Sequence, residues 1–201
     1  STRVTITRPF WLGKYDVTQK EWRVLMEDNP SKFRGDDRPV EQVTWARAME
    51  FCSRRTQRER DAGRLPEGYA YRLPTEAQWE YACRAGTTGP YAGNLDDLAW
   101  YSGTSGVQTH PVGQKRPNVW GLYDMHGNVW QWCLDWYANK LPGGSVTDPT
   151  GPRSGSSRVN RGGSWRYLPP FCRSACRNAC EPGVRYSFLG FRVALAPVPA
   201  D

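Results

Sequence analysis

Arg161-Gly-Gly-Ser-Trp165 and Leu189-Gly-Phe-Arg-Val193 are two compact blocks near the end of this 201-residue chain. The 23 residues between them, 166–188, show neither helical nor strand periodicity over a useful length, and their prolines interrupt regular ladders. The segment is nevertheless rich in Tyr, Phe, Leu, Val and Arg, which make strong contacts when they are exposed. Such a segment is either folded tightly against the body of the protein or built to touch another molecule.

The rest of the sequence predicts three helices and several short strands. Helices are expected over 19–27, over 45–60 and after Thr75. Thr18 with Glu21, and Thr75 with Gln78, have the spacing of a capping box, in which each side chain satisfies the other residue's backbone N–H. Strands are expected over 4–7, 10–15, 128–136, 158–161 and 191–195. The Pro- and Gly-rich stretch 140–157 indicates an exposed loop.

Composition places the chain among globular proteins. With 38% hydrophobic residues and 10 Trp, it has enough apolar material for a substantial core in one domain over 1–201. No apolar run approaches the ~20 residues of a membrane-spanning helix, so we expect no membrane span. The net charge is +7, but the densest basic run, 54–60, contains Glu59 and indicates a solvated helix face, not a nucleic-acid site. Abundant Arg and 16 Pro also suit a thermostable protein.

The six cysteines fall into two sets. Those in apolar or aromatic surroundings are expected to be small buried residues: Cys52, Cys83 and Cys133. Cys172, Cys176 and Cys180 recur every four residues, a spacing that invites a metal interpretation. Zinc normally takes four ligands from paired Cys or His knuckles, and both histidines are far away in sequence, so a metal is disfavoured. The sequence leaves open whether any of these cysteines form disulfides.

Six blocks resemble the formylglycine-generating enzyme, or sulfatase-modifying-factor, domain family. They are Pro39-Val-Glu-Gln-Val-Thr-Trp45, Tyr71-Arg-Leu-Pro-Thr-Glu-Ala-Gln-Trp-Glu-Tyr-Ala82, Gly121-Leu-Tyr-Asp-Met-His-Gly-Asn-Val-Trp-Gln-Trp132, Arg161-Gly-Gly-Ser-Trp165, Arg173-Ser-Ala175 and Gly190-Phe-Arg-Val193. The blocks follow the family's order over nearly the whole chain. The resemblance implies an α+β domain with a C-type-lectin-like fold, two or three helices, small antiparallel sheets and much irregular structure.

The family's oxidases use two copper-binding cysteines, and the resemblance carries their positions to Tyr167 and Cys172. A phenol does not replace a soft sulfur ligand of copper(I). We therefore expect no enzymatic activity and interpret Cys172 as a packing residue. Two alternatives stay open: an oxidase acting on a sulfatase cysteine, with Cys172 and Cys176 as a rearranged copper pair, and a noncatalytic accessory domain with fixed loops.

The block 121–132 binds calcium in family members, and the resemblance implies ligands at Asp124, Gly127, Val129 and Gln131. Calcium favours charged carboxylates, and Gln131 stands where the family has Glu, so a site here is predicted to be weak and no cofactor to be required. In the alternative interpretation, Asp124 caps a turn and Gln131 is an exposed strand residue.

The C-terminal blocks further resemble one branch of this family, the variable proteins of diversity-generating retroelements. In that branch, error-prone reverse transcription at template adenines turns AAY codons into NNY, which excludes Trp, Lys, Gln, Glu and Met. Between 166 and 188 only Glu181 belongs to this set, which accounts for 33 of the other 178 residues. The resemblance implies a non-enzymatic ligand-binding protein with 158–195 as a framed variable region.

Thirteen positions in this region are expected to contact the ligand. They are Arg166, Tyr167, Leu168, Phe171, Cys172, Cys176, Asn178, Ala179, Cys180, Val184, Tyr186, Ser187 and Phe188. The sequence does not specify the ligand. A protein or a cell-surface molecule is the expected class, with display at a cell surface or on a phage, and a nucleic acid is not expected.

Overall fold

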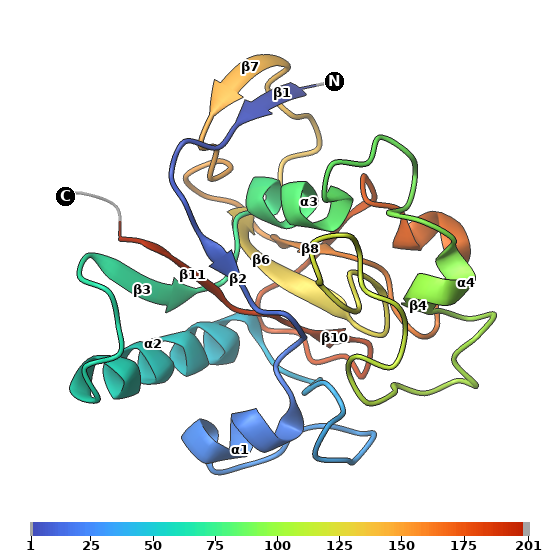
Figure 1. Ribbon diagram of the computed structural model, residues 1–201, viewed down its shortest axis with the longest axis horizontal. Helices are drawn as coiled ribbons and strands as arrows, with labels where there is room; N and C mark the ends of the chain where they lie inside the picture. The colour runs from blue at the N-terminus through green and yellow to red at the C-terminus, as the bar shows by residue number, and fades with distance from the viewer. Residues whose placement is uncertain (1, 199–201) are drawn as a thin grey trace.

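Four α-helices and one 3-10 helix lie on the surface of the molecule (Figure 1), which a computed structural model describes over residues 2–198. They are α1 (Gln19–Met26), α2 (Trp45–Asp61), α3 (Glu76–Arg84), α4 (Leu95–Leu98) and the 3-10 helix η1 (Pro169–Cys172). Both predicted capping boxes are confirmed: Thr18 with Glu21 begins α1, and Thr75 with Gln78 begins α3. No helix of the described residues is long and apolar enough to cross a membrane.

The strands form small sheets. The largest has the order β10-β6-β8-β9: Leu189–Gly190, Trp130–Trp136, Arg158–Arg161 and Arg177–Cys180. A second has the order β2-β11-β3: Trp11–Leu12, Ala194–Pro197 and Tyr69–Arg72. Two parallel pairs complete the set: β1 (Thr2–Thr5) with β7 (Gly144–Thr147), and β4 (Ala99–Trp100) with β5 (His126–Gly127). The mixed α+β class is confirmed, although not all pairs are antiparallel as expected.

An aromatic cluster forms the centre of the core. Trp22 of α1 and Phe51 of α2 stack with ring centroids 5.7 Å apart, and Phe191 packs edge-on against both rings. Trp132 of β6 is fully buried, and its Nε1 donates to Val43 O at 2.9 Å. These contacts join the N-terminal helices to the central sheet (Figure 1).

Several expected boundaries are wrong. Within 10–15 only Trp11–Leu12 is a strand, and 191–195 is not one strand, because β10 ends at Gly190 and β11 begins at Ala194. The predicted loop 140–157 contains β7, which pairs with β1 at the opposite end of the sequence. Local composition carries no information about such a distant partner.

The segment 166–188 also contains more regular structure than its sequence indicates. Arg177–Cys180 forms β9 at the edge of the large sheet, paired in register with Arg158–Arg161. All four residues of β9 are half-buried, so the alternation that identifies a strand in a sequence is absent. The position of this strand is fixed by its hydrogen bonds with β8, and not by a preference of its own residues for strand structure.

Candidate functional site

The segment 166–188 covers one side of the molecule, where η1 is the orange coil at the right of Figure 1. Its most exposed apolar side chains are Leu168 (61%), Phe171 (43%) and Tyr186 (41%). Arg166 is exposed as well, and further predicted contact residues are half-buried: Tyr167, Cys176, Asn178, Ala179, Cys180, Val184 and Ser187. These eleven residues can all present atoms to a ligand. We refer to the other described residues, 2–165 and 189–198, as the framework.

The prediction of ligand contact is wrong for two of the thirteen positions. Cys172 is 0% exposed and Phe188 is 9% exposed, and Phe188 belongs to the main hydrophobic core. Cys172 lies directly against Gly163: a Cβ at position 163 would be 2.5 Å from its Sγ. Both residues hold the segment against the framework, and the interpretation of Cys172 as a packing residue fits this position.

The main chain of the segment is held by the framework at many points. Eight of its carbonyl oxygens accept hydrogen bonds from framework groups. The acceptors are the carbonyls of Tyr167, Pro169, Cys172, Cys176, Pro182, Tyr186, Ser187 and Phe188. The corresponding donors belong to Ser102, Tyr91, His126, Arg161, Trp45, Gln42, Trp165 and Trp130. Together with the β8–β9 ladder, these bonds fix the course of the segment without using its exposed side chains.

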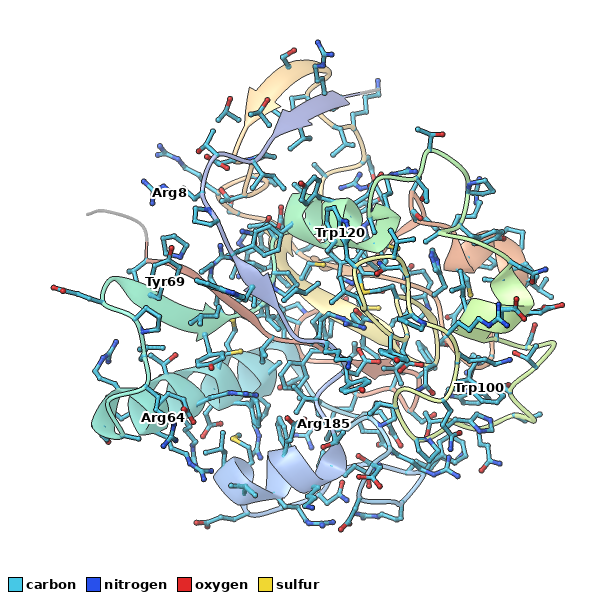
Figure 2. The ribbon with its side chains drawn as sticks, in the orientation of Figure 1. Arg8, Arg64, Tyr69, Trp100, Trp120 and Arg185 are labelled. Carbon is cyan, nitrogen blue, oxygen red and sulfur yellow. The ribbon has the colours of Figure 1, made fainter. Side chains whose placement is uncertain are left out.

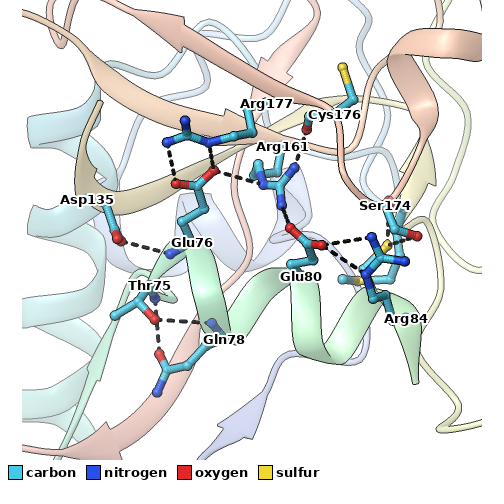
Figure 3. Close-up of polar contacts among 12 residues, drawn as sticks. Thr75, Glu76, Gln78, Glu80, Arg84, Asp135, Arg161, Ser174, Cys176 and Arg177 are labelled. Carbon is cyan, nitrogen blue, oxygen red and sulfur yellow. Dashed lines mark hydrogen bonds and ion pairs between the residues drawn. The ribbon is translucent and has the colours of Figure 1, made fainter. Parts of the chain in front are cut away.

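A buried ion cluster joins the segment to α3 (Figure 3). Arg161 of β8 is fully buried; its guanidinium contacts the carboxylate of Glu80 and lies 3.3 Å from Glu76 Oε1. Its Nη1 also donates to Cys176 O. Arg177 of β9 makes a bidentate pair with Glu76 at 2.6 and 2.8 Å. Arg177 therefore fixes the position of β9, and it is not one of the thirteen predicted contact positions.

His126 anchors the segment near η1. Ala92 N donates to His126 Nε2 at 3.1 Å, so the hydrogen of the neutral ring is on Nδ1, which lies 2.7 Å from Cys172 O. Burial lowers the pKa of His126, which keeps the ring neutral. The Cys83 thiol lies 3.7 Å from Nε2, and burial raises its pKa to about 12. A buried protonated thiol is not a nucleophile, so this pair indicates packing and anchoring.

The cysteines of the segment are free thiols, as are all six in the chain. Cys172 is buried, and burial raises its pKa to about 12; burial also raises the pKa of Cys176. Copper(I) binds thiolates, so both environments work against the rearranged copper pair. Within residues 2–198, no group of three or more His, Cys, Asp or Glu side chains is placed to share a metal ion.

The residues of the implied calcium site do not fit that ion. Gln131 is fully buried, not exposed, and its Oε1 accepts from Trp79 Nε1 at 2.6 Å and from Arg192 Nε at 2.7 Å. Its Nε2 donates to Asp124 O at 2.9 Å. Both lone pairs of the amide oxygen are therefore used by protein donors.

The other positions of that block also serve the fold. Asp124 has φ 57°, and its Oδ2 accepts from Gly113 N at 2.8 Å, which agrees with a turn-capping role. Burial raises the pKa of Asp124 to about 6. Gly127 has φ 92° and lies against Trp100, where a Cβ would meet Trp100 O, while Val129 is a core residue.

Comparison with known proteins identifies the family. The model of the sulfatase-modifying factor enzyme 1-like domain matches residues 1–197. The chain belongs to the sulfatase-modifying-factor domain family. It has the C-type-lectin-like α+β fold that the sequence blocks imply for this family, with small sheets and long irregular connections.

Proteins that carry different functional names resemble this chain. It is 36% identical to a chaperone protein LppX of Paenibacillus barcinonensis over 78% of its own length and 69% of that protein. It is 33% identical to mouse formylglycine-generating enzyme over 95% of its length, but spans only 52% of the mouse protein. The structure of Treponema denticola variable protein 1 superposes with a TM-score of 0.89 at 36% identity, over 96% of this chain and 86% of that one.

Sequence reasoning missed most of the anchoring groups. Tyr91, Ser102 and Ser105 lie in a stretch where the sequence predicted no helix or strand, yet each bonds to a carbonyl within or next to the segment. His126 stands in one of the family blocks, and that was the one signal for its importance. For Arg161, its place in the Gly-Gly-Ser-Trp block marked it as fixed but did not predict its ion pairs with Glu76 and Glu80.

Proposed function

We propose that this protein binds a ligand through the exposed side chains of 166–188 and that these side chains vary between copies of the gene. One observation carries the proposal: framework groups hold the segment by its main-chain carbonyls, while Leu168, Phe171 and Tyr186 are exposed. A hydrogen bond to a carbonyl does not depend on the side chain of that residue. Such a surface tolerates many sequences on one backbone.

The relatives support a nonenzymatic role. Treponema denticola variable protein 1 is named as a variable protein and has the same fold at 36% identity. At the implied copper position this chain has Tyr167, whose ring packs edge-on against Trp130 and Phe188. The aromatic ring is thus used for packing, and its phenol offers copper(I) no soft ligand.

The composition of the segment supports diversification by a retroelement. Tyr, Leu, Phe, Cys, Asn, Ala, Val and Ser are all encoded by NNY codons, and they fill the contact positions apart from Arg166. The three cysteines then have no joint role. Exposed aromatic residues provide contact area at a small cost in side-chain entropy, as they do in antibody loops.

The expected ligand is a protein or a cell-surface molecule, bound by protein displayed at a cell surface or on a phage. The exposed residues are spread along the segment from Arg166 to Tyr186. A contact surface of this extent suits an extended partner better than a small molecule enclosed in one pocket.

Sequencing the gene in many isolates tests the proposal. We expect substitutions to concentrate at the codons of Leu168, Phe171 and Tyr186, with a near-copy of the 3′ end and a reverse transcriptase gene nearby. The codons of Arg161 and Gly163 serve as matched controls and should not vary. Equal variation at the two sets of codons, or no second copy of the 3′ end, would contradict diversification.

A second candidate is a copper-dependent oxidase, favoured by the 33% identity to mouse formylglycine-generating enzyme. The reduced protein can be titrated with copper(I), and the Cys172→Ser variant compared. Tight one-to-one binding that disappears in the variant would support the oxidase. We expect weak binding that is equal in both proteins.

A further inference from the structure

A cavity of about 320 Å³ lies at the base of the β1–β7 pair, away from the segment 166–188. The stretches after β1 and β7, the end of β3 and the first turn of α3 contribute its walls. Figure 2 shows Arg8, which lines the cavity, at the upper left and Arg185 of the segment near the bottom of the molecule. This volume is at the lower end of the range for small-molecule sites.

Two arginines, Arg72 and Arg8, line the cavity. No carboxylate of residues 2–198 lies within 4.0 Å of the guanidinium of Arg72 or Arg8. Arg72 is half-buried, and it donates to one acceptor in the described chain, Leu73 O at 3.1 Å. A guanidinium has five N–H donors, so most donors of Arg72 are free for another partner.

The acid in the cavity is already engaged. Asp148 accepts hydrogen bonds from the backbone N–H and the hydroxyl of Thr7, and these bonds hold its pKa below the usual range. Asp135 does not line the cavity and accepts from Glu76 N at 2.8 Å. Asp148 keeps its negative charge, so the lining holds two arginines against one carboxylate and keeps a net positive charge.

The remaining lining combines amide and apolar groups. Gln78 uses its Oε1 to accept from Thr75 N, while its Nε2 has no acceptor among the described residues. Ile6, Pro149 and Pro197 provide apolar surface. The cavity therefore offers planar cationic donors and an amide donor beside an apolar wall.

We propose that this cavity binds a small oxyanion, a carboxylate or a phosphate ester, that is attached to an apolar group. Arg72 and Arg8 contact the oxyanion, Gln78 Nε2 donates to it, and the apolar group lies against Ile6 and the prolines. The site is independent of the ligand surface at 166–188.

Titration of the whole chain with benzoate, phenyl phosphate and benzamide tests the site, followed by calorimetry or by amide chemical shifts. We expect one or both anions to bind, and the neutral benzamide to bind at least about tenfold more weakly, because it lacks the charge. Comparing the two anions separates a carboxylate ligand from a phosphate ligand. Equal binding of benzamide and both anions would overturn the proposal.

Substitutions of residues that line the cavity show whether the anion binds there. Arg72→Gln is expected to weaken anion binding about tenfold, and Arg64→Gln is the control because Arg64 is exposed and pairs with Glu59. Gln78→Glu is a second test: Glu completes a capping box as Gln does, so α3 is preserved while a negative charge enters the cavity. Anion binding that survives Gln78→Glu at wild-type affinity would overturn the proposal even if Arg72→Gln does not fold.

Discussion

Strand β6 and the segment 166–188 are held in place in different ways. Strand β6 pairs with β8 and β10, and its buried side chains add specific bonds: Gln131 binds Trp79 and Arg192, and Trp132 donates to Val43 O. In the segment, the main chain makes the bonds, and the exposed side chains contribute little to them. A strand whose buried side chains make specific bonds tolerates few sequences, whereas a segment held by its carbonyls tolerates many. Substitutions in the buried framework and in the exposed part of the segment should therefore differ in their effect on stability.

The largest effect is expected for Arg161→Leu. This substitution removes the fully buried cation between Glu80 and Glu76 and the donor to Cys176 O, while Glu80 keeps Arg84 and Glu76 keeps Arg177. Removing one partner of a buried pair costs about 3–5 kcal/mol, and the two remaining arginines place the expected loss in the lower part of that range, at about 3–4 kcal/mol. Urea denaturation should show a loss of this size. The matched control is Arg185→Leu, because Arg185 is exposed and its loss should change the stability by less than about 0.5 kcal/mol.

Phe188→Ser tests a residue of the segment whose side chain belongs to the hydrophobic core. Phe188 is 9% exposed, stacks on Tyr186 and meets Tyr167 edge-on, so the substitution removes core packing. A loss of about 3 kcal/mol is expected. Phe171→Ser, at a 43% exposed position, is the control and should cost less than about 1 kcal/mol. Equal losses for the two variants would mean that burial does not separate core from contact residues here.

The sequence predicted the framework better than the site. The capping boxes of α1 and α3 are local signals, because both partners lie within one turn, and both were predicted at the correct residues. The pairing of β1 with β7 was not predictable from either strand, since their partners are about 140 positions apart in sequence.

The predictions for the site differ in the same way between local signals and contacts with distant residues. The blocks around 166–188 marked its limits, and of the thirteen predicted contact positions four are exposed, seven are half-buried and two are buried. Burial of Cys172 and Phe188 could not be predicted, because it depends on Gly163 and on a core assembled from distant parts of the chain. The hydrogen-bond donors came from residues such as Tyr91 and Ser102, whose surrounding sequence has no periodicity.

The pH dependence of the stability tests the burial of Asp135 in β6. Burial raises the pKa of Asp135 from 3.8 to about 7. Between these values the folded protein retains a proton that the unfolded chain has released, so this residue's contribution to stability falls as the pH rises from about 4 to about 7. Asp135→Asn keeps an acceptor for Glu76 N and removes the titration. Relative to wild type, the variant should gain up to about 1 kcal/mol per pH unit over this range.

The measurement is urea denaturation of both proteins at pH 5, 6 and 7. Subtracting the two curves removes the contributions of other buried acids, such as Glu41, whose pKa burial raises to about 7. A difference that does not change with pH would show that the carboxyl of Asp135 is hydrated in the folded protein.

The smallest effect is expected for the combined replacement of Leu168, Phe171 and Tyr186 by Ser. These are the side chains that the main-chain bonds leave free, with exposures of 61%, 43% and 41%. The carbonyls of Tyr186 and its neighbours keep their donors in the variant, so the total loss of stability should stay below about 1 kcal/mol. Thermal unfolding of the triple variant measures this directly. A loss as large as that of Phe188→Ser would mean that these side chains hold the segment as Gln131 and Trp132 hold β6, and it would remove the physical basis for sequence variation at this surface.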